Sequence, residues 1–247
     1  MVFNITECVD FHHGKRIVIT ILVCGHDVVI IMHKEGDALL IQQPVYYPFR
    51  EVIEDNGRIF VNNQLHYEDG KYTIDFEDFE KKIVDNNVKV FILCNPHNPV
   101  GRVWTKEELE KMGDICLKHN VVIMDDEIHC DFTYPGFKFT SFMTLDKKYH
   151  NSLVLYTSPS KTFNVAGLQP ANIIIKNQEL RAAYRKANVA AGYSQGSIMG
   201  QVAVKSVYTK GDEWVNELVE YITGNMNYMR DFVKENFPKA QFVDPEG

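Results

Sequence analysis

The sequence predicts an α/β fold, a three-layer αβα sandwich around a mainly parallel sheet. Short apolar runs alternate with amphipathic stretches along most of the chain, which is the pattern of repeated strand–helix–strand units. Polar segments directly follow three of the apolar runs, and functional loops of doubly wound sheets gather at the carboxyl ends of strands. The 247 residues, of which 45% are hydrophobic, are enough for one large domain with a substantial core.

The first half of the chain begins this pattern with strands and a helix. Residues 38–42 form a short apolar run that stops before Pro44, and residues 58–61 form the next run after an Asn-Gly turn. Residues 76–84 predict a helix, because their apolar side chains recur at helical spacing with acidic residues between them. Residues 88–94 are almost continuously apolar and predict a buried strand.

The second half continues the alternation of helix and strand. The T-x-x-E sequence at 105–108 is a capping box that opens a helix, and Asn120 is expected to end it. Residues 121–124, 153–156 and 171–175 are apolar runs that predict three further strands.

Three helices are expected after the last of these strands, at residues 178–189, 194–209 and 212–237. The third is unusually long, carries a stripe of large apolar side chains and stops at a Phe-Pro sequence. Residues 17–27 near the start of the chain are instead rich in β-branched side chains and predict strand.

Charge and hydropathy exclude two classes of partner. The formal net charge is −7 and the basic residues are scattered, so we expect no nucleic-acid binding. The most apolar stretch, residues 17–32, is interrupted by His26 and Asp27 and is shorter than the roughly 20 residues that a membrane helix needs. We therefore expect no membrane partner.

The cysteines predict neither a metal site nor a disulfide framework. They are five, an odd number, and none of them forms a C-x-x-C pair. A reducing cytoplasm is the compartment that this usage favours. The five are Cys8, Cys24, Cys94, Cys116 and Cys130.

A lysine lies just after the strand predicted for residues 153–156. The segment 158–164, with the sequence S-P-S-K-T-F-N, places Lys161 where its side chain can point into a site. Lysine forms a Schiff base with aldehyde cofactors, and neighbouring hydroxyls such as those of Ser158 and Ser160 can hold a cofactor's phosphate. An exposed loop lysine beside serines is the alternative interpretation of this segment taken alone.

Two other polar segments follow apolar strands in the same way. The sequence N-P-H-N-P-V-G at 95–101 follows strand 88–94, and D-D-E-I-H at 125–129 follows strand 121–124. Because the carboxyl ends of parallel strands meet at one edge of a sheet, the three segments predict a single site built from three loops.

In order and spacing, the three segments resemble the fold-type-I, pyridoxal-phosphate (PLP)-dependent aminotransferase superfamily. The sequences D-E-I-H and S-P-S-K-T-F-N resemble most closely its branch of aminotransferase-like cystathionine β-lyases, also called C–S lyases. The resemblance runs from about residue 34 to residue 247. It implies the large domain of a PLP-dependent transferase, with PLP as the cofactor, an amino acid as the substrate and a homodimer as the assembly.

The resemblance assigns the central chemistry to Lys161 and Asp126. Lys161 would hold the cofactor as a Schiff base and, once substrate displaces it, would move protons to and from the substrate α-carbon. Asp126 would keep the pyridine nitrogen of the cofactor protonated, so that the ring can accept electrons from that carbon. An acidic cap or a solvated aspartate is the alternative for Asp126, since Asp125 and Glu127 flank it.

Five further cofactor-binding residues are implied by the same resemblance. Tyr46 would stack on the pyridine ring, Asn98 would donate a hydrogen bond to its phenolic oxygen, and His129 would lie near the same edge. Ser158 would bind the phosphate through its hydroxyl, with Ser160 as a second donor. Ordinary packing is the alternative for Tyr46, and a structural role is the alternative for His129.

The resemblance also divides the chain into three parts. Residues 34–210 correspond to the PLP-binding large domain, and residues 211–247 correspond to a long helix and the start of a C-terminal small domain that is otherwise absent. Residues 1–33 are a divergent or unmatched segment, because they do not show the glycine-containing phosphate turn that the family has there.

The function implied is that of a PLP-dependent C–S β-lyase, which takes cystathionine or a related cysteine S-conjugate to pyruvate, ammonia and a thiol. An aminotransferase is the alternative enzyme, although transaminases more usually have a tyrosine in place of His129. A truncated, non-catalytic remnant of the fold is a further alternative, because residues 1–33 do not match and most of the second domain is missing.

Overall fold

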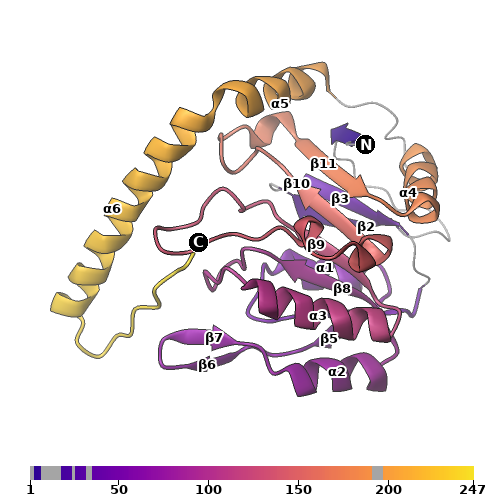
Figure 1. The fold of residues 1–247 in the computed structure, drawn as a ribbon, viewed down its shortest axis with the longest axis horizontal. Helices are drawn as coiled ribbons and strands as arrows, with labels where there is room; N and C mark the ends of the chain where they lie inside the picture. The colour runs from indigo at the N-terminus through magenta and orange to yellow at the C-terminus, as the bar shows by residue number, and fades with distance from the viewer. Residues whose placement is uncertain (1–2, 7–17, 24–25, 32–34, 191–196) are drawn as a thin grey trace.

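The computed structural model describes residues 3–6, 18–23, 26–31, 35–190 and 197–247. Within these residues, the main sheet has seven strands in the order β1-β11-β10-β9-β8-β4-β5 (Figure 1). The strands are β1 (Phe3–Thr6), β4 (Ala38–Ile41), β5 (Ile59–Asn62), β8 (Val88–Cys94), β9 (Val122–Asp126), β10 (Leu153–Thr157) and β11 (Pro170–Ile175).

The sheet is mainly parallel, as predicted. The neighbouring strands from β10 to β5 all run parallel, whereas β11 pairs antiparallel with β10 and β1 pairs antiparallel with β11. The strands β8, β9 and β10 end level with one another, because Cys94 and Tyr156 both lie opposite Asp126 in the register. The loops that follow these three strands therefore leave from one edge of the sheet.

Helices cover both faces of the sheet and make the predicted three-layer sandwich. One face carries α2 (Phe76–Asp85), α3 (Lys106–Lys118) and two short 3₁₀ helices, η1 (Phe142–Thr144) and η2 (Lys147–Ser152). The other face carries α1 (Pro48–Asp55) and α4 (Gln178–Ala190), which pack on it through large apolar side chains.

Strand alternation divides the core between these two faces. On β4, Leu39 and Ile41 pack with the helices α1 and α4, whereas Ala38 and Leu40 pack with α2 and α3. All four side chains are at most 2% exposed. A strand that is buried on both sides has no polar face, which is why its sequence is continuously apolar rather than alternating.

The capping box at the start of α3 is formed as predicted. The Thr105 hydroxyl accepts a hydrogen bond from the Glu108 backbone N–H, and the Glu108 carboxylate accepts one from the Thr105 N–H. The helix ends at Lys118, and Asn120 follows with a φ of 55°, a left-handed conformation that commonly ends helices.

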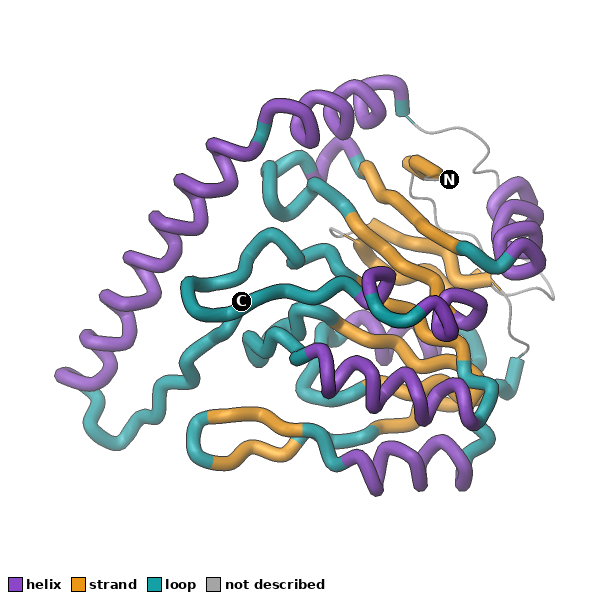
Figure 2. Tube along the Cα trace, in the orientation of Figure 1, coloured by secondary structure: helices purple, strands orange, loops and turns teal. Residues whose placement is uncertain are grey.

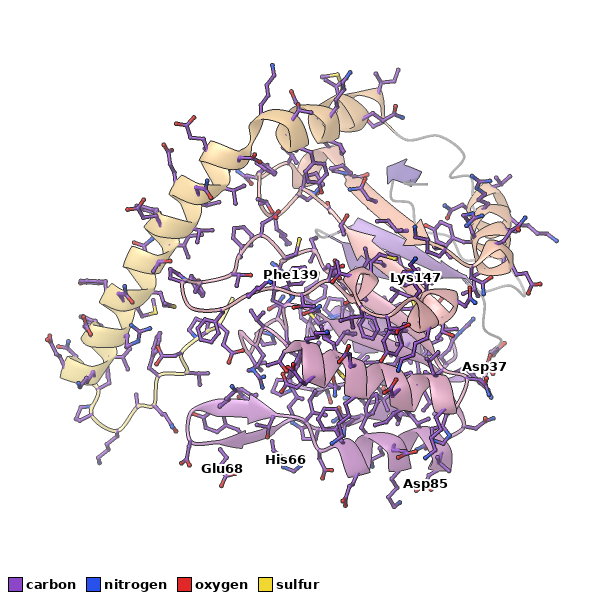
Figure 3. The ribbon with its side chains drawn as sticks, viewed as in Figure 1. Asp37, His66, Glu68, Asp85, Phe139 and Lys147 are labelled. Carbon is purple, nitrogen blue, oxygen red and sulfur yellow. The ribbon has the colours of Figure 1, made fainter. Side chains whose placement is uncertain are left out.

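Helix α1 and the hairpin of β6 (His66–Glu68) and β7 (Lys71–Thr73) are among the elements that were not predicted. Helix α1 is short and begins at Pro48, and the prolines around it interrupt the apolar periodicity that identifies longer helices. The hairpin of β6 and β7 turns through two residues with positive φ. All of β6 is exposed, so it lacks the buried apolar run that predicts the core strands, and its side chains His66 and Glu68 point outward (Figure 3).

The strand character predicted near the start of the chain is confirmed. Strands β2 (Val18–Val23) and β3 (His26–Ile31) pair antiparallel as a separate two-stranded sheet. Some predictions concern residues outside the described part of the chain. These are the predictions for Cys8 and Cys24, for the start of the resemblance at residue 34, and for residues 194–196 of the helix expected at 194–209.

The chain leaves the sandwich through α5 (Ile198–Lys210) and α6 (Asp212–Asn236), which Figure 1 shows extending along one side of the molecule. No residue of α6 is buried, and its side chains project along its whole length (Figure 3). Among the described residues, none of the helices combines the length and the apolar character that crossing a membrane requires. Exposed apolar side chains on α5 and α6 include Ile198, Met199, Val202, Trp214, Tyr221, Tyr228, Met229 and Phe232.

Candidate active site

Three loops meet at the carboxyl ends of β8, β9 and β10, as the sequence predicts (Figure 2). The loop after β8 carries Asn98, the loop after β9 carries His129, and the loop after β10 carries Lys161. Asp126 is the last residue of β9, which is the middle strand of the three. This arrangement brings together polar residues that are up to 63 positions apart in the sequence.

Asp126 is a buried carboxyl group with a perturbed pKa. It is 3% exposed, and its Oδ1 accepts a hydrogen bond of 3.2 Å from the Ile128 backbone N–H. Burial raises its pKa and Glu127 adds to the rise, whereas the Ile128 N–H and the Lys161 ammonium oppose it, and the resulting pKa is about 7. A cation placed against this carboxylate would offset the cost of burying its charge.

The two neighbouring carboxylates face a different environment. Burial and the nearby Glu127 raise the pKa of Asp125 well above its usual value. The Oε1 atom of Glu127 accepts a hydrogen bond of 3.0 Å from the Phe142 backbone N–H, on the face of the sheet that α2 and α3 cover. Because side chains alternate along a strand, Asp125 and Asp126 point to opposite faces, and Asp126 is the one that interacts with Lys161.

Lys161 lies in a tight turn after β10 and is exposed, whereas the next residue, Thr162, is 1% exposed. The Thr162 hydroxyl donates a hydrogen bond of 2.7 Å to Asp131 Oδ2, and the Thr162 carbonyl accepts one of 3.2 Å from the Trp214 indole. These bonds anchor the turn to the loop after β9 and to the first turn of α6. The lysine is therefore free to reach solvent while its backbone is held in place.

His129 is partly buried near Lys161. Burial, together with the positive charge of Lys161, lowers the pKa of His129 to about 4. The imidazole is therefore neutral at physiological pH and can exchange hydrogen bonds without adding a second cation beside the lysine.

Ser158 and Ser160 are both buried and bonded to each other. Their hydroxyl oxygens lie 2.8 Å apart, the Ser160 backbone N–H donates to Ser158 Oγ at 3.1 Å, and the Ser158 hydroxyl donates to the Pro170 carbonyl. Phosphate binding by Ser158 stays a prediction. It would require the Ser158 hydroxyl to turn away from Pro170, since a hydroxyl has a single proton to donate.

The loop that carries Asn98 is organised by residues that the sequence analysis did not single out. The Asn98 backbone N–H donates to the Cys94 sulfur at 3.4 Å, and the buried His97 ring nitrogen Nε2 lies 2.9 Å from the Pro44 carbonyl. The Trp104 indole packs edge-on against His97 and donates to the Cys94 carbonyl at 2.9 Å. The sequence signal that could have identified these residues is the presence of aromatic and polar side chains in and just after the Asn-Pro motif.

Tyr46 lies at the point where the order of strands reverses. The strand that follows β4 in the chain, β5, lies on one side of it, whereas β8 lies on its other side and is followed outward by β9 and β10. The loops after β4 and β8 therefore leave in opposite directions, which makes a topological switch point between these two strands. Tyr46 is partly buried there and packs edge-on against Phe49, with ring centres 5.6 Å apart. The bond between His97 and Pro44 links its loop to the loop of Asn98. Ring stacking by Tyr46 stays a prediction.

The family model for class I and II aminotransferases matches residues 24–247, nearly the whole chain. The chain belongs to the class I and II aminotransferase family. Its sequence is 42% identical to cystathionine β-lyase PatB of Bacillus subtilis over 85% of this chain and 54% of that protein. It is also 31% identical to the protein MalY of Escherichia coli over 85% of this chain and 54% of that protein.

Solved structures of PLP-containing proteins are also similar to this chain. A PLP-bound putative aminotransferase from Clostridium difficile superposes with a TM-score of 0.84 and 40% identity, over 87% of this chain and 55% of that one. Cystalysin from Treponema denticola, which contains PLP, has a TM-score of 0.81 and 39% identity, over 83% and 52%. The chain spans about half the length of the curated relatives and solved structures that it matches.

These comparisons confirm the resemblance to PLP-dependent enzymes and to their C–S lyase branch, and they confirm the fold class. PLP is the cofactor of the family. Two observations indicate that the residues of this chain fit PLP. A carboxyl group whose pKa is raised by burial lies at the end of β9, where a protonated ring nitrogen would stabilise its ionised form. An exposed lysine on an anchored turn lies within electrostatic range of that carboxyl group.

Proposed function

We propose that the protein is a PLP-dependent C–S β-lyase that acts on cystathionine or other cysteine S-conjugates. The reaction would take up water and release pyruvate, ammonia and a thiol. The observation that carries the proposal is the electrostatic coupling of Asp126, His129 and Lys161 at the ends of adjacent parallel strands. The names of the relatives support the lyase, since several are cystathionine β-lyases or C–S lyases.

The side chains of the site would divide the work as follows. Bound PLP would supply an electron sink for the negative charge that develops at the substrate α-carbon. Asp126 would hold a proton at the ring nitrogen, because its buried carboxylate strongly favours a positive partner. Lys161 Nζ would carry the cofactor and then move protons at the α-carbon. Neutral His129 and Asn98 would orient the ring through hydrogen bonds, and Tyr46 would pack on its face.

An aminotransferase is the second candidate, because some relatives carry that activity in their names. A probable kynurenine–oxoglutarate transaminase of Saccharomyces cerevisiae is 31% identical over 70% of this chain. Both reactions need Lys161 and Asp126, so these residues do not separate them. A non-catalytic remnant of the fold is the third candidate, and turnover of the purified chain separates it from the two enzymes.

Turnover of the purified chain with PLP tests the proposal. We expect release of a thiol and pyruvate from cystathionine without an added keto acid. Transfer of the amino group to an added keto acid, with no thiol released, would favour the aminotransferase. A protein that stays colourless in PLP and releases neither product would support the remnant.

We also propose that the protein forms a homodimer in the cytoplasm, with residues 34–210 as the large domain and residues 211–247 leading to a second one. Exposed apolar side chains on α5 and α6 support the dimer, because patches of more than a few hundred Å² are unusual on monomers. Light scattering of the purified chain should give the mass of two copies, or of larger aggregates. A monodisperse monomer would contradict this prediction.

A further inference from the structure

Glu246 is a buried acidic residue in a segment that is otherwise mostly exposed. Residues 234–241, which end α6 and begin the following tail, are all exposed. The tail then runs back to the sandwich (Figure 2), where Glu246 is only 7% exposed. A carboxylate is expensive to bury, so its partners must compensate for the lost hydration.

The Glu246 side chain is matched by donors from three sources. Its Oε2 atom accepts hydrogen bonds of 2.9 Å from Arg102 Nε and 2.9 Å from the Val103 backbone N–H. Its Oε1 atom lies 3.2 Å from Lys71 Nζ on β7. Burial alone would raise the pKa of Glu246, but the Val103 N–H and Arg102 outweigh it and hold the pKa below its usual value.

The Glu246 backbone makes contacts of its own with two different loops. Its N–H donates to the Gly101 carbonyl at 2.6 Å, and its carbonyl accepts a hydrogen bond of 3.0 Å from the Tyr134 N–H. Gly101 has a φ of 70°, and a Cβ there would lie 2.5 Å from the Cβ of Pro245. The glycine of the N-P-x-N-P-x-G sequence is thus needed for the tail to approach as well as for its own backbone conformation.

These contacts join two of the loops that form the candidate site. Gly101, Arg102 and Val103 belong to the loop that carries Asn98, and the His97 N–H donates to the Arg102 carbonyl at 2.8 Å, which closes that loop on itself. Tyr134 belongs to the loop that leaves β9 and carries His129. One tail residue therefore bonds to both loops.

We propose that Glu246 is a positioning residue, which holds the Asn98 loop against the His129 loop and thereby raises the affinity of the site for PLP. The proposal rests on the proposed PLP-dependent function. Arg102 Nη2 also donates to both carboxylate oxygens of Glu108, at 2.9 Å to each, and these contacts do not involve Glu246. Loss of the Glu246 carboxylate should therefore loosen the loops without leaving the guanidinium unpaired.

The test compares Glu246→Ala and Glu246→Gln with the unchanged chain. Hydrogen exchange at the Val103 and Tyr134 amides should be faster in Glu246→Ala without cofactor, and the Kd for PLP in equilibrium dialysis should rise about tenfold or more. Glu246→Gln keeps a neutral acceptor and should show a smaller rise in both. If the alanine variant does not fold, exchange and Kd measured on Glu246→Gln still test the proposal.

Asp244→Asn is the matched control, because Asp244 also pairs with an arginine, Arg230, but is exposed and contacts neither loop. Its exchange and its Kd should match those of the unchanged chain. Unchanged exchange in both Glu246 variants, or a lower stability with an unchanged Kd, would overturn the positioning role alone. An unchanged chain that binds no PLP would overturn the proposed function, and this inference with it.

Discussion

Replacement of Lys161 by alanine should abolish covalent attachment of PLP and lower β-lyase turnover by at least about 10²–10⁴-fold, the usual contribution of a positioned acid–base group. The side chain is exposed and its turn is anchored by Thr162, so the fold should remain. The free energy of unfolding without cofactor should change by less than about 0.5 kcal/mol.

Borohydride reduction followed by peptide mass spectrometry measures the attachment directly. The cofactor mass should appear on the peptide that contains Lys161 in the unchanged chain and on no peptide of the variant. Lys176→Ala is the control, because Lys176 is also exposed and directly follows a strand, β11. Cofactor found on another lysine, or unaltered turnover by Lys161→Ala, would remove Lys161 from its role.

Local sequence patterns were sufficient to predict much of the sandwich. Strand β8 has the bounds predicted for it, because an apolar run between polar turns has few other structures open to it. Helix α3 begins where its capping box predicts, because Thr105 and Glu108 satisfy backbone N–H groups that are otherwise unpaired. Both signals lie within a few residues of the element they specify.

Contacts between distant residues were not predictable in this way. Arg102 and Glu246 are 144 positions apart, and neither has a neighbour in sequence that indicates the other. The bond from Ser158 to Pro170 likewise depends on the antiparallel return of β11 beside β10. Lys161, Asp126 and Asn98 were predicted from motifs, and the structure adds that Asp126 is the one of the clustered acids that interacts with the lysine.

Asp126→Asn should have effects of opposite sign on activity and on the stability of the cofactor-free chain. An amide cannot hold a positive charge at the cofactor's ring nitrogen, so turnover should fall about 10²–10³-fold, as for the loss of one well-placed electrostatic contact. A fall of less than about tenfold, or 1.4 kcal/mol, would transfer the role to Asp125 or Glu127. Asp125→Asn is the control for turnover, because Asp125 is equally buried but points to the opposite face.

The stability effect follows from the pKa of Asp126, which is about 7 in the fold and near 4 in an unfolded chain. Between these pH values the folded chain binds the proton and the unfolded chain does not, so the carboxyl group increasingly destabilises the fold as pH rises from 4 to 7. An asparagine side chain does not titrate, so the variant does not lose stability in this way as the pH rises. Without cofactor, Asp126→Asn should match the unchanged chain near pH 4 and exceed it above pH 7 by up to about 4 kcal/mol. Denaturant unfolding at both pH values measures the difference, and a variant less stable than the unchanged chain at pH 8 would show that the buried carboxylate already has a compensating partner.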